Sequence, residues 1–204
     1  MLFSDSFFTI KQNARGSYKD KGSKFMAYAY PVKTEEEIKA CLSQLKKEHV
    51  GARHFCYAWR LGADKQAWRV NDDGEPSSSA GKPIFSQILS HDLTNILIVV
   101  VRYFGGTLLG VGGLIKAYKS AAEDALKNSE VIEQFIYFQY KLIFDVDDVN
   151  QVMKLCKDIE AVIISQDYTE NYTLVFNVKK SVSETLEEKI KQIYHSKLTY
   201  LKTL

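Results

Sequence analysis

The chain has 204 residues, of which 46% are hydrophobic and 25% are charged, and its formal net charge is +2. This composition is typical of globular proteins and excludes a disordered chain, and the length suits two small domains. The longest apolar run, residues 96–101, is far shorter than the roughly 20 residues that cross a bilayer, so we expect no transmembrane helix and no membrane partner.

The N-terminal segment, MLFSDSFFTIKQ, mixes Asp and Ser with its apolar residues and lacks the basic start and cleavage site of a secretion signal. The three cysteines, Cys41, Cys56 and Cys156, are odd in number and form no C-x-x-C pair. This pattern indicates neither a disulfide framework nor a zinc site. We therefore expect a cytoplasmic protein with buried thiols.

Strand and helix patterns alternate through the first part of the chain. Strands are predicted over residues 25–30, 53–61, 66–70 and 96–101. A helix is predicted after Thr34, because Glu37 completes a capping box, a short helix is predicted to begin at Pro83, and Leu114 opens the apolar stripe of a third helix. The last strand is apolar throughout, so we expect it to be buried on both faces. We predict a mixed layer with a sheet on one side and helices on the other.

A change in composition divides the chain. All 11 glycines lie at or before Gly113, and all three prolines lie at or before Pro83. The polar residues 127–130 separate a helical pattern from an alternating one, which predicts an N-terminal domain over residues 1–128 and a C-terminal domain over residues 134–204. Residues 1–130 hold 18 Lys and Arg against 14 Asp and Glu, and residues 131–204 hold 9 against 11. The first part therefore carries +4 and the second −2.

The second part has the clearer pattern. Strands are predicted over residues 136–144, 161–165, 172–178 and 198–201. Helical spacing of apolar residues begins at Val149 and again at Ser181, where Glu184 lies three residues on. The order β-α-β-β-α-β is the ferredoxin-like pattern. The fold class that we predict is therefore α+β with two domains.

Residues 102–113 run from a strand end through five glycines into a helix. These glycines are Gly105, Gly106, Gly110, Gly112 and Gly113. Glycine lets backbone amides approach a ligand, and a helix N-terminus offers free N–H groups, so this is the candidate phosphate or nucleic-acid site, with Arg102 and Lys116 as its cations. The spacing is neither that of a P-loop nor the full G-x-G-x-x-G of dinucleotide folds. The alternative is a purely structural strand-to-helix turn.

Three carboxylates, Asp72, Asp73 and Glu75, fall within five residues on a Gly/Pro turn. Such a turn could hold Mg²⁺ through one or two carboxylates and water. A solvated turn, or an ion pair with Arg102 or Arg60, would account for the same residues. We favour the ion pair over metal binding, leave the solvated turn open, and assign no metal site.

The strand over residues 53–60 places bulky and small side chains on opposite faces. Tyr57 and Trp59 lie on the bulky face and could stack RNA bases as a platform. His54 and Arg60 lie on the small face. Packing of the aromatic residues in the core or at a domain contact is the alternative, and we favour it.

Four ordered motifs are similar to those of a known family. They are Ala52-Arg53-His54-x-Cys56-x-Ala58-x-Arg60, Asp72-Asp73-Gly74-Glu75-Pro76, Ala80-Gly81-Lys82-Pro83-Ile84, and residues 99–106 followed by Leu109-Gly110-x-Gly112-Gly113-Leu114. Over residues 15–128 the chain thereby resembles the IMPACT/YigZ family, although Ser78-Ser79 stands where the family usually has Gly-Thr. The resemblance implies a motif surface that includes His54, Arg60, Asp72, Asp73 and Glu75.

The resemblance also implies a fold and a function. The N-terminal domain is expected to be similar to the second domain of a small-subunit ribosomal protein and to domain IV of elongation factor G. The tail is expected to be ferredoxin-like and similar to domain V of that factor. Eukaryotic relatives are regulators of translation that act through a protein partner of a stress-responsive kinase pathway.

We therefore predict a cytoplasmic, non-catalytic factor that associates with RNA or the ribosome and takes part in the regulation of translation, with no cofactor. One alternative is a phosphoryl-transfer or RNA-processing enzyme that holds Mg²⁺ at Asp72, Asp73 and Glu75. Another alternative is a regulator that binds a protein partner and no nucleic acid.

Overall fold

The computed structural model describes residues 5–204, so the first four residues of the N-terminal segment considered above lie outside it. The described residues form two compact units, one of Phe7–Gln134 and one of Phe135–Leu204 with Asp5 and Ser6. Two strands that the sequence pattern did not predict, β1 (Ser6–Ile10) and β7 (Val131–Phe135), pair with each other. None of the described helices combines the length and apolar content needed to span a bilayer.

The first unit contains a five-stranded antiparallel sheet. Its strands are β2 (Ala14–Asp20), β3 (Ser23–Pro31), β4 (His54–Leu61), β5 (Ala67–Asn71) and β6 (Ile96–Tyr103). They lie in the order β2-β3-β6-β4-β5, and every pair of neighbours is antiparallel. The central strand is β6, where residues 96–101 are fully buried, as their uninterrupted apolar sequence predicts.

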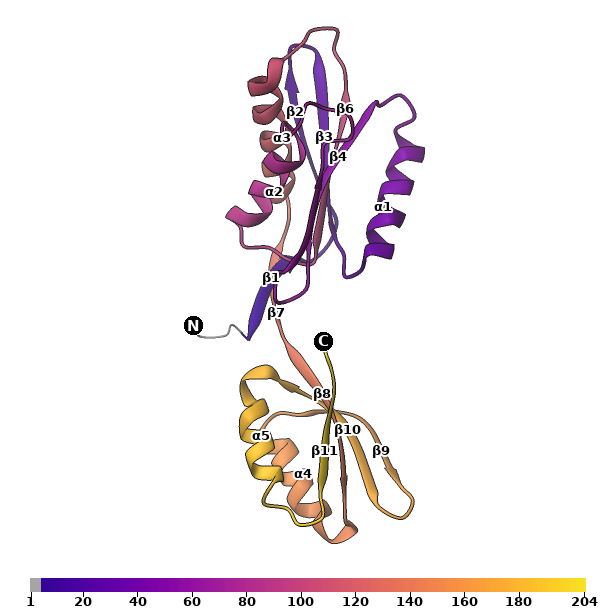
Figure 1. The fold of residues 1–204 in the computed structure, drawn as a ribbon, viewed down its shortest axis with the longest axis vertical. Coiled ribbons are helices and arrows are strands. Elements are labelled where there is room, and N and C mark those ends of the chain that lie inside the picture. Colours follow the sequence, from indigo (N-terminus) through magenta and orange to yellow (C-terminus); the bar gives the residue numbers. More distant parts are fainter. Residues whose placement is uncertain (1–4) are drawn as a thin grey trace. The chain divides into compact units, whose positions relative to one another are not determined.

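Helices cover both faces of this sheet, which corrects the prediction of helices on one side (Figure 1). The helices α2 (Gly81–Ser90) and α3 (Gly110–Lys127) pack on the face that carries Ile98 and Val100 of β6. The helix α1 (Glu35–Glu48) packs on the face that carries Leu97 and Val99. Side chains alternate along a strand, and both sets on β6 are apolar, so each face needs its own apolar cover.

The starts of two helices show which local signals were sufficient. The Thr34 hydroxyl accepts a hydrogen bond from the Glu37 amide at 3.3 Å, and the Glu37 carboxylate reaches back to a backbone amide at 2.6 Å. The predicted capping of α1 is therefore present. In contrast, α2 begins at Gly81 and not at Pro83. The reason is Asp72, nine residues earlier in the chain, whose carboxylate accepts a hydrogen bond from the Gly81 amide at 2.8 Å.

The second unit follows the order β-α-β-β-α-β predicted for residues 134–204. Its elements are β8 (Tyr137–Phe144), α4 (Val149–Asp158), β9 (Val162–Tyr168), β10 (Tyr172–Lys179), α5 (Ser183–Ile190) and β11 (Lys197–Thr203). Short 3₁₀ turns, Val146–Asp148 and Lys180–Val182, precede the two helices. The sheet has the order β11-β8-β10-β9 with antiparallel neighbours, and α4 and α5 form a core with alternate residues of β8 and β10.

Candidate nucleic-acid interface

The glycine-rich segment connects the end of β6 to the start of α3. Gly105 lies against the β2–β3 turn, where its amide donates to the Ser23 hydroxyl at 3.1 Å, and a Cβ at Gly105 would overlap the backbone of Gly22 and Ser23. Gly106 and Gly110 have φ angles of +86° and +70°, in the left-handed region that favours glycine. These three glycines are therefore required by the geometry of the backbone.

Among the residues that the structure describes, none caps the first turn of α3 with its side chain. Its N-cap residue, Leu109, makes no side-chain hydrogen bond, and the turn contains no acidic residue. A Cβ at Gly112 would meet no atom within 4 Å, and one at Gly113 would meet only the Leu109 side chain. The first amides of the helix therefore lack side-chain acceptors, and the positive end of the helix dipole is not neutralised locally. Lys116 is exposed two turns into the same helix.

Arg102 is buried and paired. Only 6% of its side chain is exposed, and its Nη1 donates to Glu75 Oε1 at 2.6 Å. The Tyr118 hydroxyl donates to the same carboxylate oxygen at 2.7 Å, and the Cys56 thiol donates to the Tyr118 oxygen at 3.3 Å. Burial raises the pKa of both Tyr118 and Cys56 well above the ordinary values, so both groups stay protonated. We call these four residues the buried network.

The position of Arg102 corrects its assigned role. The sequence placed its guanidinium beside the glycine-rich segment as a phosphate ligand, but the structure directs it to Glu75 inside the unit. The rings of Phe25 and Phe104 each lie with their centroid 5.5 Å from its Cζ. The ion pair that we favoured over metal binding is therefore observed for Glu75, with Arg102 as its partner.

The other carboxylates of the turn also bind backbone groups. Asp72 accepts hydrogen bonds from three amides that lead into α2, at 2.8, 3.0 and 2.8 Å. Burial raises the pKa of Asp72, but these hydrogen bonds outweigh burial and hold the pKa below its ordinary value of 3.8. Asp73 accepts a hydrogen bond from the Phe55 amide at 2.7 Å. Within residues 5–204, no group of three or more His, Cys, Asp or Glu side chains is arranged to hold a metal ion.

The two remaining motif residues on β4 also make internal contacts. Arg60 is buried, its Nε donates to the Leu93 carbonyl at 2.6 Å, and its Nη2 lies 3.2 Å from an Asp92 carboxylate oxygen. His54 is half-buried, and its Nδ1 donates to the Asp73 carbonyl at 2.8 Å. These residues hold β4 to the neighbouring loops, so the motif surface implied by the family resemblance is largely an internal framework.

The aromatic face of β4 lies beneath α1. Trp59 is 6% exposed and belongs to the same core cluster as Ile38 and Leu45 of that helix, and Tyr57 packs half-buried against this cluster. Side chains beneath a helix cannot stack on bases. This face is therefore not available as a platform for RNA bases. Its aromatic residues pack in the core, which is the alternative that we favoured.

Exposed cations gather at the end of the sheet where α3 begins. Lys19, Lys21 and Lys24 lie on or beside the β2–β3 turn, with Asp20 as the carboxylate of that turn. Lys24 lies opposite Tyr103 near the end of β6, and the exposed Arg53 directly precedes β4. Figure 1 shows the β2–β3 turn and the loop into α3 at the same end of the unit.

We call Lys19, Lys21, Lys24, Arg53 and Lys116 the basic end. Of these five residues, the sequence pattern indicated only Lys116 as part of the site. The three lysines of the β2–β3 turn were missed because β2, with the sequence ARGSYKD, has too few apolar residues to predict a strand. Without β2 there was no β2–β3 turn to place these lysines beside the glycine-rich segment.

Comparison with known proteins identifies the family. The Impact N-terminal domain matches residues 21–126, which is just over half of the chain. An IMPACT family member of Haemophilus influenzae is 34% identical over 172 residues, covering 83% of this chain and 84% of that protein. The chain belongs to the IMPACT family. The IMPACT family member YigZ of Escherichia coli is 36% identical over 150 residues, covering 72% of this chain and 74% of that protein.

Two solved structures are also similar to this IMPACT family chain. A crystal structure described as that of a hypothetical protein is 28% identical, covers 98% of both chains and has a TM-score of 0.73. The structure of the two-domain translational regulator Yih1 is 30% identical and covers 60% of this chain and 47% of that chain, with a TM-score of 0.36. The first of these supports the described arrangement of elements.

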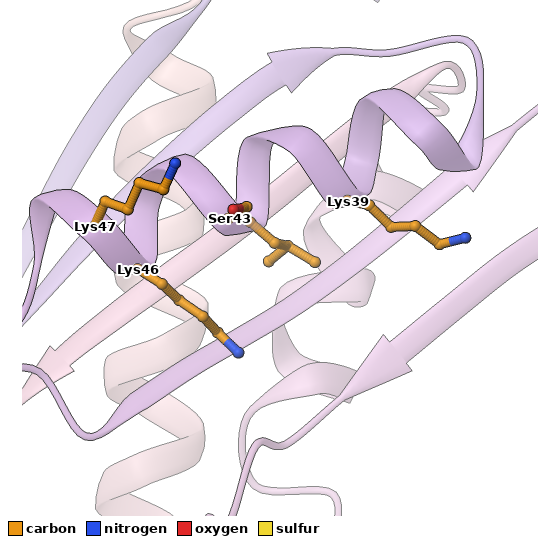
Figure 2. Close-up of a pocket in the computed structure, with 5 residues that line it drawn as sticks. Lys39, Ser43, Lys46 and Lys47 are labelled. Atoms are coloured by element: carbon orange, nitrogen blue, oxygen red, sulfur yellow. The ribbon is translucent and has the colours of Figure 1, made fainter.

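The family match begins at the β2–β3 turn and ends in α3. It therefore contains the buried network, the glycine-rich segment and all of the basic end except Lys19. It also contains a shallow hollow along α1, lined by Lys39, Leu42, Ser43, Lys46 and Lys47. Figure 2 shows Lys39 and Lys46 extending from one side of the helix. The hollow offers no buried polar group to orient a ligand, so we leave it outside the candidate site.

Proposed function

We propose that this IMPACT family protein takes part in the regulation of translation by binding RNA or the ribosome through its basic end. Membership of the family supports the link to translation, because the family resemblance implies that role for eukaryotic members. The observation that carries the RNA contact is the set of exposed cations around the uncapped start of α3. Phosphate groups are the ligands that such a surface attracts.

The state of the neighbouring carboxylates strengthens this proposal. Asp72, Asp73 and Glu75 lie close in the chain to the motifs of the site, and free carboxylates there would repel phosphate. Glu75 is instead compensated by its ion pair with Arg102, and Asp72 and Asp73 direct carboxylate oxygens at backbone amides inside the unit. The same contacts weigh against a turn that holds Mg²⁺ for catalysis, since both oxygens of Asp72 and one oxygen each of Asp73 and Glu75 already accept hydrogen bonds. The proposed role is therefore that of a non-catalytic factor.

A protein partner is the second candidate, and one observation favours it. Leu108, Val111 and Ile115, at the start of α3, are 82%, 53% and 40% exposed. Their spacing of three and four residues places Val111 and Ile115 on one side of the helix. Exposed apolar groups of this kind mark contacts with other proteins more often than contacts with RNA backbone.

The test compares two variants of the full chain with equal charge change. One carries Lys19→Gln, Lys21→Gln and Lys24→Gln, and its control carries exchanges at Lys33, Lys39 and Lys127, which are exposed. Lys33 follows the far end of β3 and Lys127 ends α3, so the control leaves the basic end intact. Binding is measured with a labelled 12-nucleotide oligouridylate at several salt concentrations, and by cosedimentation with ribosomal particles.

We expect the first variant to bind RNA at least fivefold more weakly and to flatten the logarithmic salt dependence by up to about 0.7 for each lost contact with a single strand. The control should bind like the unmodified chain. Equal affinity and salt dependence in both variants would refute the RNA contact at the basic end. If a Leu108→Asp exchange then removed a captured protein, the second candidate would replace it.

A further inference from the structure

One face of the sheet in the second unit is left open by its helices. The buried residues alternate along the two central strands and pack against α4 and α5. They are Tyr140, Leu142 and Phe144 on β8 and Leu174, Phe176 and Val178 on β10. Successive side chains of a strand point to opposite faces, so the half-buried residues between them lie on the other face. None of the helices described in this unit packs there, as Figure 1 shows.

The strand register places three lysines together on this open sheet face. Lys141 occupies the centre, on β8. On the neighbouring strand β11, Lys197 lies opposite Ile143 and Lys202 lies opposite Gln139. Ile143 and Gln139 are each two residues from Lys141 and share its face, so both β11 lysines are diagonal neighbours of Lys141, at about 7–8 Å between α-carbons.

The open sheet face is basic although the second part of the chain carries −2. A fourth lysine, Lys179, belongs to the face through its pairing with Tyr137, but it forms an ion pair with Glu160 at 3.0 Å. The carboxylate on the face is Asp167, at the edge strand β9. The other carboxylates of residues 135–204 lie on the helices, the 3₁₀ turns and the loops. The fold therefore separates the charges that the linear sequence intermixes.

The character of this face points to one kind of occupant. Its centre holds a lysine and a hydrogen-bonded amide pair, Gln139 and Asn177, whose Nε2 and Oδ1 atoms are 3.0 Å apart. Protein interfaces deplete charge at their centre and place large apolar anchors there. The apolar residues of this face, Ile143 and Val175 on the central strands and Val162 on β9, are of medium size, and Tyr137 is the aromatic residue on the two central strands. Neighbouring lysines on such a face instead suit a row of phosphates. Contacts would therefore go to the RNA backbone and not to stacked bases.

We infer that the open sheet face of the second unit is an RNA-backbone binding surface, with Lys141, Lys197 and Lys202 as its phosphate contacts. This inference rests on the proposed function and adds a second contact to it. Recognition by phosphate contacts alone carries no sequence preference, so binding at this face is expected to be insensitive to sequence and steeply dependent on salt.

The experiment uses the full chain and a labelled 12-nucleotide oligouridylate. The face variant carries Lys141→Gln, Lys197→Gln and Lys202→Gln. Its matched control carries Lys154→Gln, Lys157→Gln and Lys189→Gln, which remove the same charge from exposed positions on α4 and α5. Circular dichroism verifies that each variant is folded. A single Lys202→Glu exchange on the edge strand provides the same comparison if the triple variant does not fold.

We expect the face variant to bind at least fivefold more weakly, with its salt slope reduced by up to about 2 for three lost contacts, and the helix control to bind within twofold of the unmodified chain. Equal binding by the face variant and the helix control would overturn the inference. Loss of binding to polyglutamate with unchanged RNA binding would also overturn it, in favour of an acidic protein partner.

The variant at Lys19, Lys21 and Lys24 separates this outcome from that of the proposed function. If only that variant weakens RNA binding, the inference is wrong and the proposed function stands. If only the face variant weakens binding, the inference stands and the basic end is not the contact. If neither does, both fail.

Discussion

Removal of the Glu75 carboxylate should destabilise the first unit strongly. In the folded chain Glu75 Oε1 accepts hydrogen bonds from Arg102 at 2.6 Å and from Tyr118 at 2.7 Å, and 4% of the Glu75 side chain is exposed. Glu75→Ala therefore leaves a guanidinium that is 6% exposed without its counter-charge.

The expected loss follows from this geometry. Removing one partner of a buried ion pair costs about 3–5 kcal/mol, because the remaining charge stays desolvated. Arg102 has little to compensate for the loss of Glu75, since among residues 5–204 its buried Nε has no hydrogen-bond partner. The double variant Glu75→Gln with Arg102→Met removes both charges and keeps an acceptor for the Tyr118 hydroxyl. The double variant should therefore lose less unfolding free energy than Glu75→Ala alone. Comparing the unfolding free energies of the two variants measures this difference.

Urea unfolding followed by tryptophan fluorescence measures the loss of stability in the first unit. The two tryptophans of the chain, Trp59 and Trp68, both lie within Phe7–Gln134. Glu123→Ala is the control, because Glu123 forms an exposed ion pair with Lys127 one helical turn away, and its removal should leave the unfolding midpoint nearly unchanged. A loss below about 1 kcal/mol in Glu75→Ala would show that the pair is not desolvated, and the structural role assigned to it would be wrong.

Three further predictions concern single positions. The pKa of Asp72 is lowered in the folded chain, so the carboxylate stabilises the fold above pH 3.8, and this contribution is lost as pH falls through the folded pKa. Asp72→Asn should therefore cost about 1 kcal/mol of unfolding free energy at pH 7. It should also flatten the acid side of the stability profile measured by urea unfolding. Gly105→Ala should lower the melting temperature, because its Cβ would overlap the β2–β3 backbone, whereas Gly112→Ala should leave it unchanged or raise it, since the added atom meets open space in a helix. In the native protein Cys41 should react with a thiol reagent before Cys156, because Cys41 is half-buried whereas burial raises the pKa of Cys156 to about 11. Peptide mass spectrometry identifies the order of reaction, and equal rates at the two cysteines would contradict the prediction.

Local signals in the sequence were enough for elements that depend on near neighbours. Thr34 and Glu37 cap α1 from three residues apart, so the start of that helix could be predicted. The alternation of apolar residues in 136–144 and 172–178 predicted the central strands of the second unit, because one face of each is buried and the other is not. The apolar run 96–101 likewise predicted the buried strand β6.

Contacts between distant residues decided the site. Glu75 and Arg102 are 27 residues apart, and only the fold brings them into a buried pair, so a cation that looked available for phosphate became part of the interior. The lysines beside the β2–β3 turn lie next to the glycine-rich segment because β2 pairs with β3, and no local sequence pattern predicts this pairing. The same holds for Lys141, Lys197 and Lys202, which the register of β8 and β11 gathers on one face. Composition and periodicity report what each segment tends to form and bury, whereas the position of a charge relative to solvent depends on which segments pair, and pairing is a property of the whole chain.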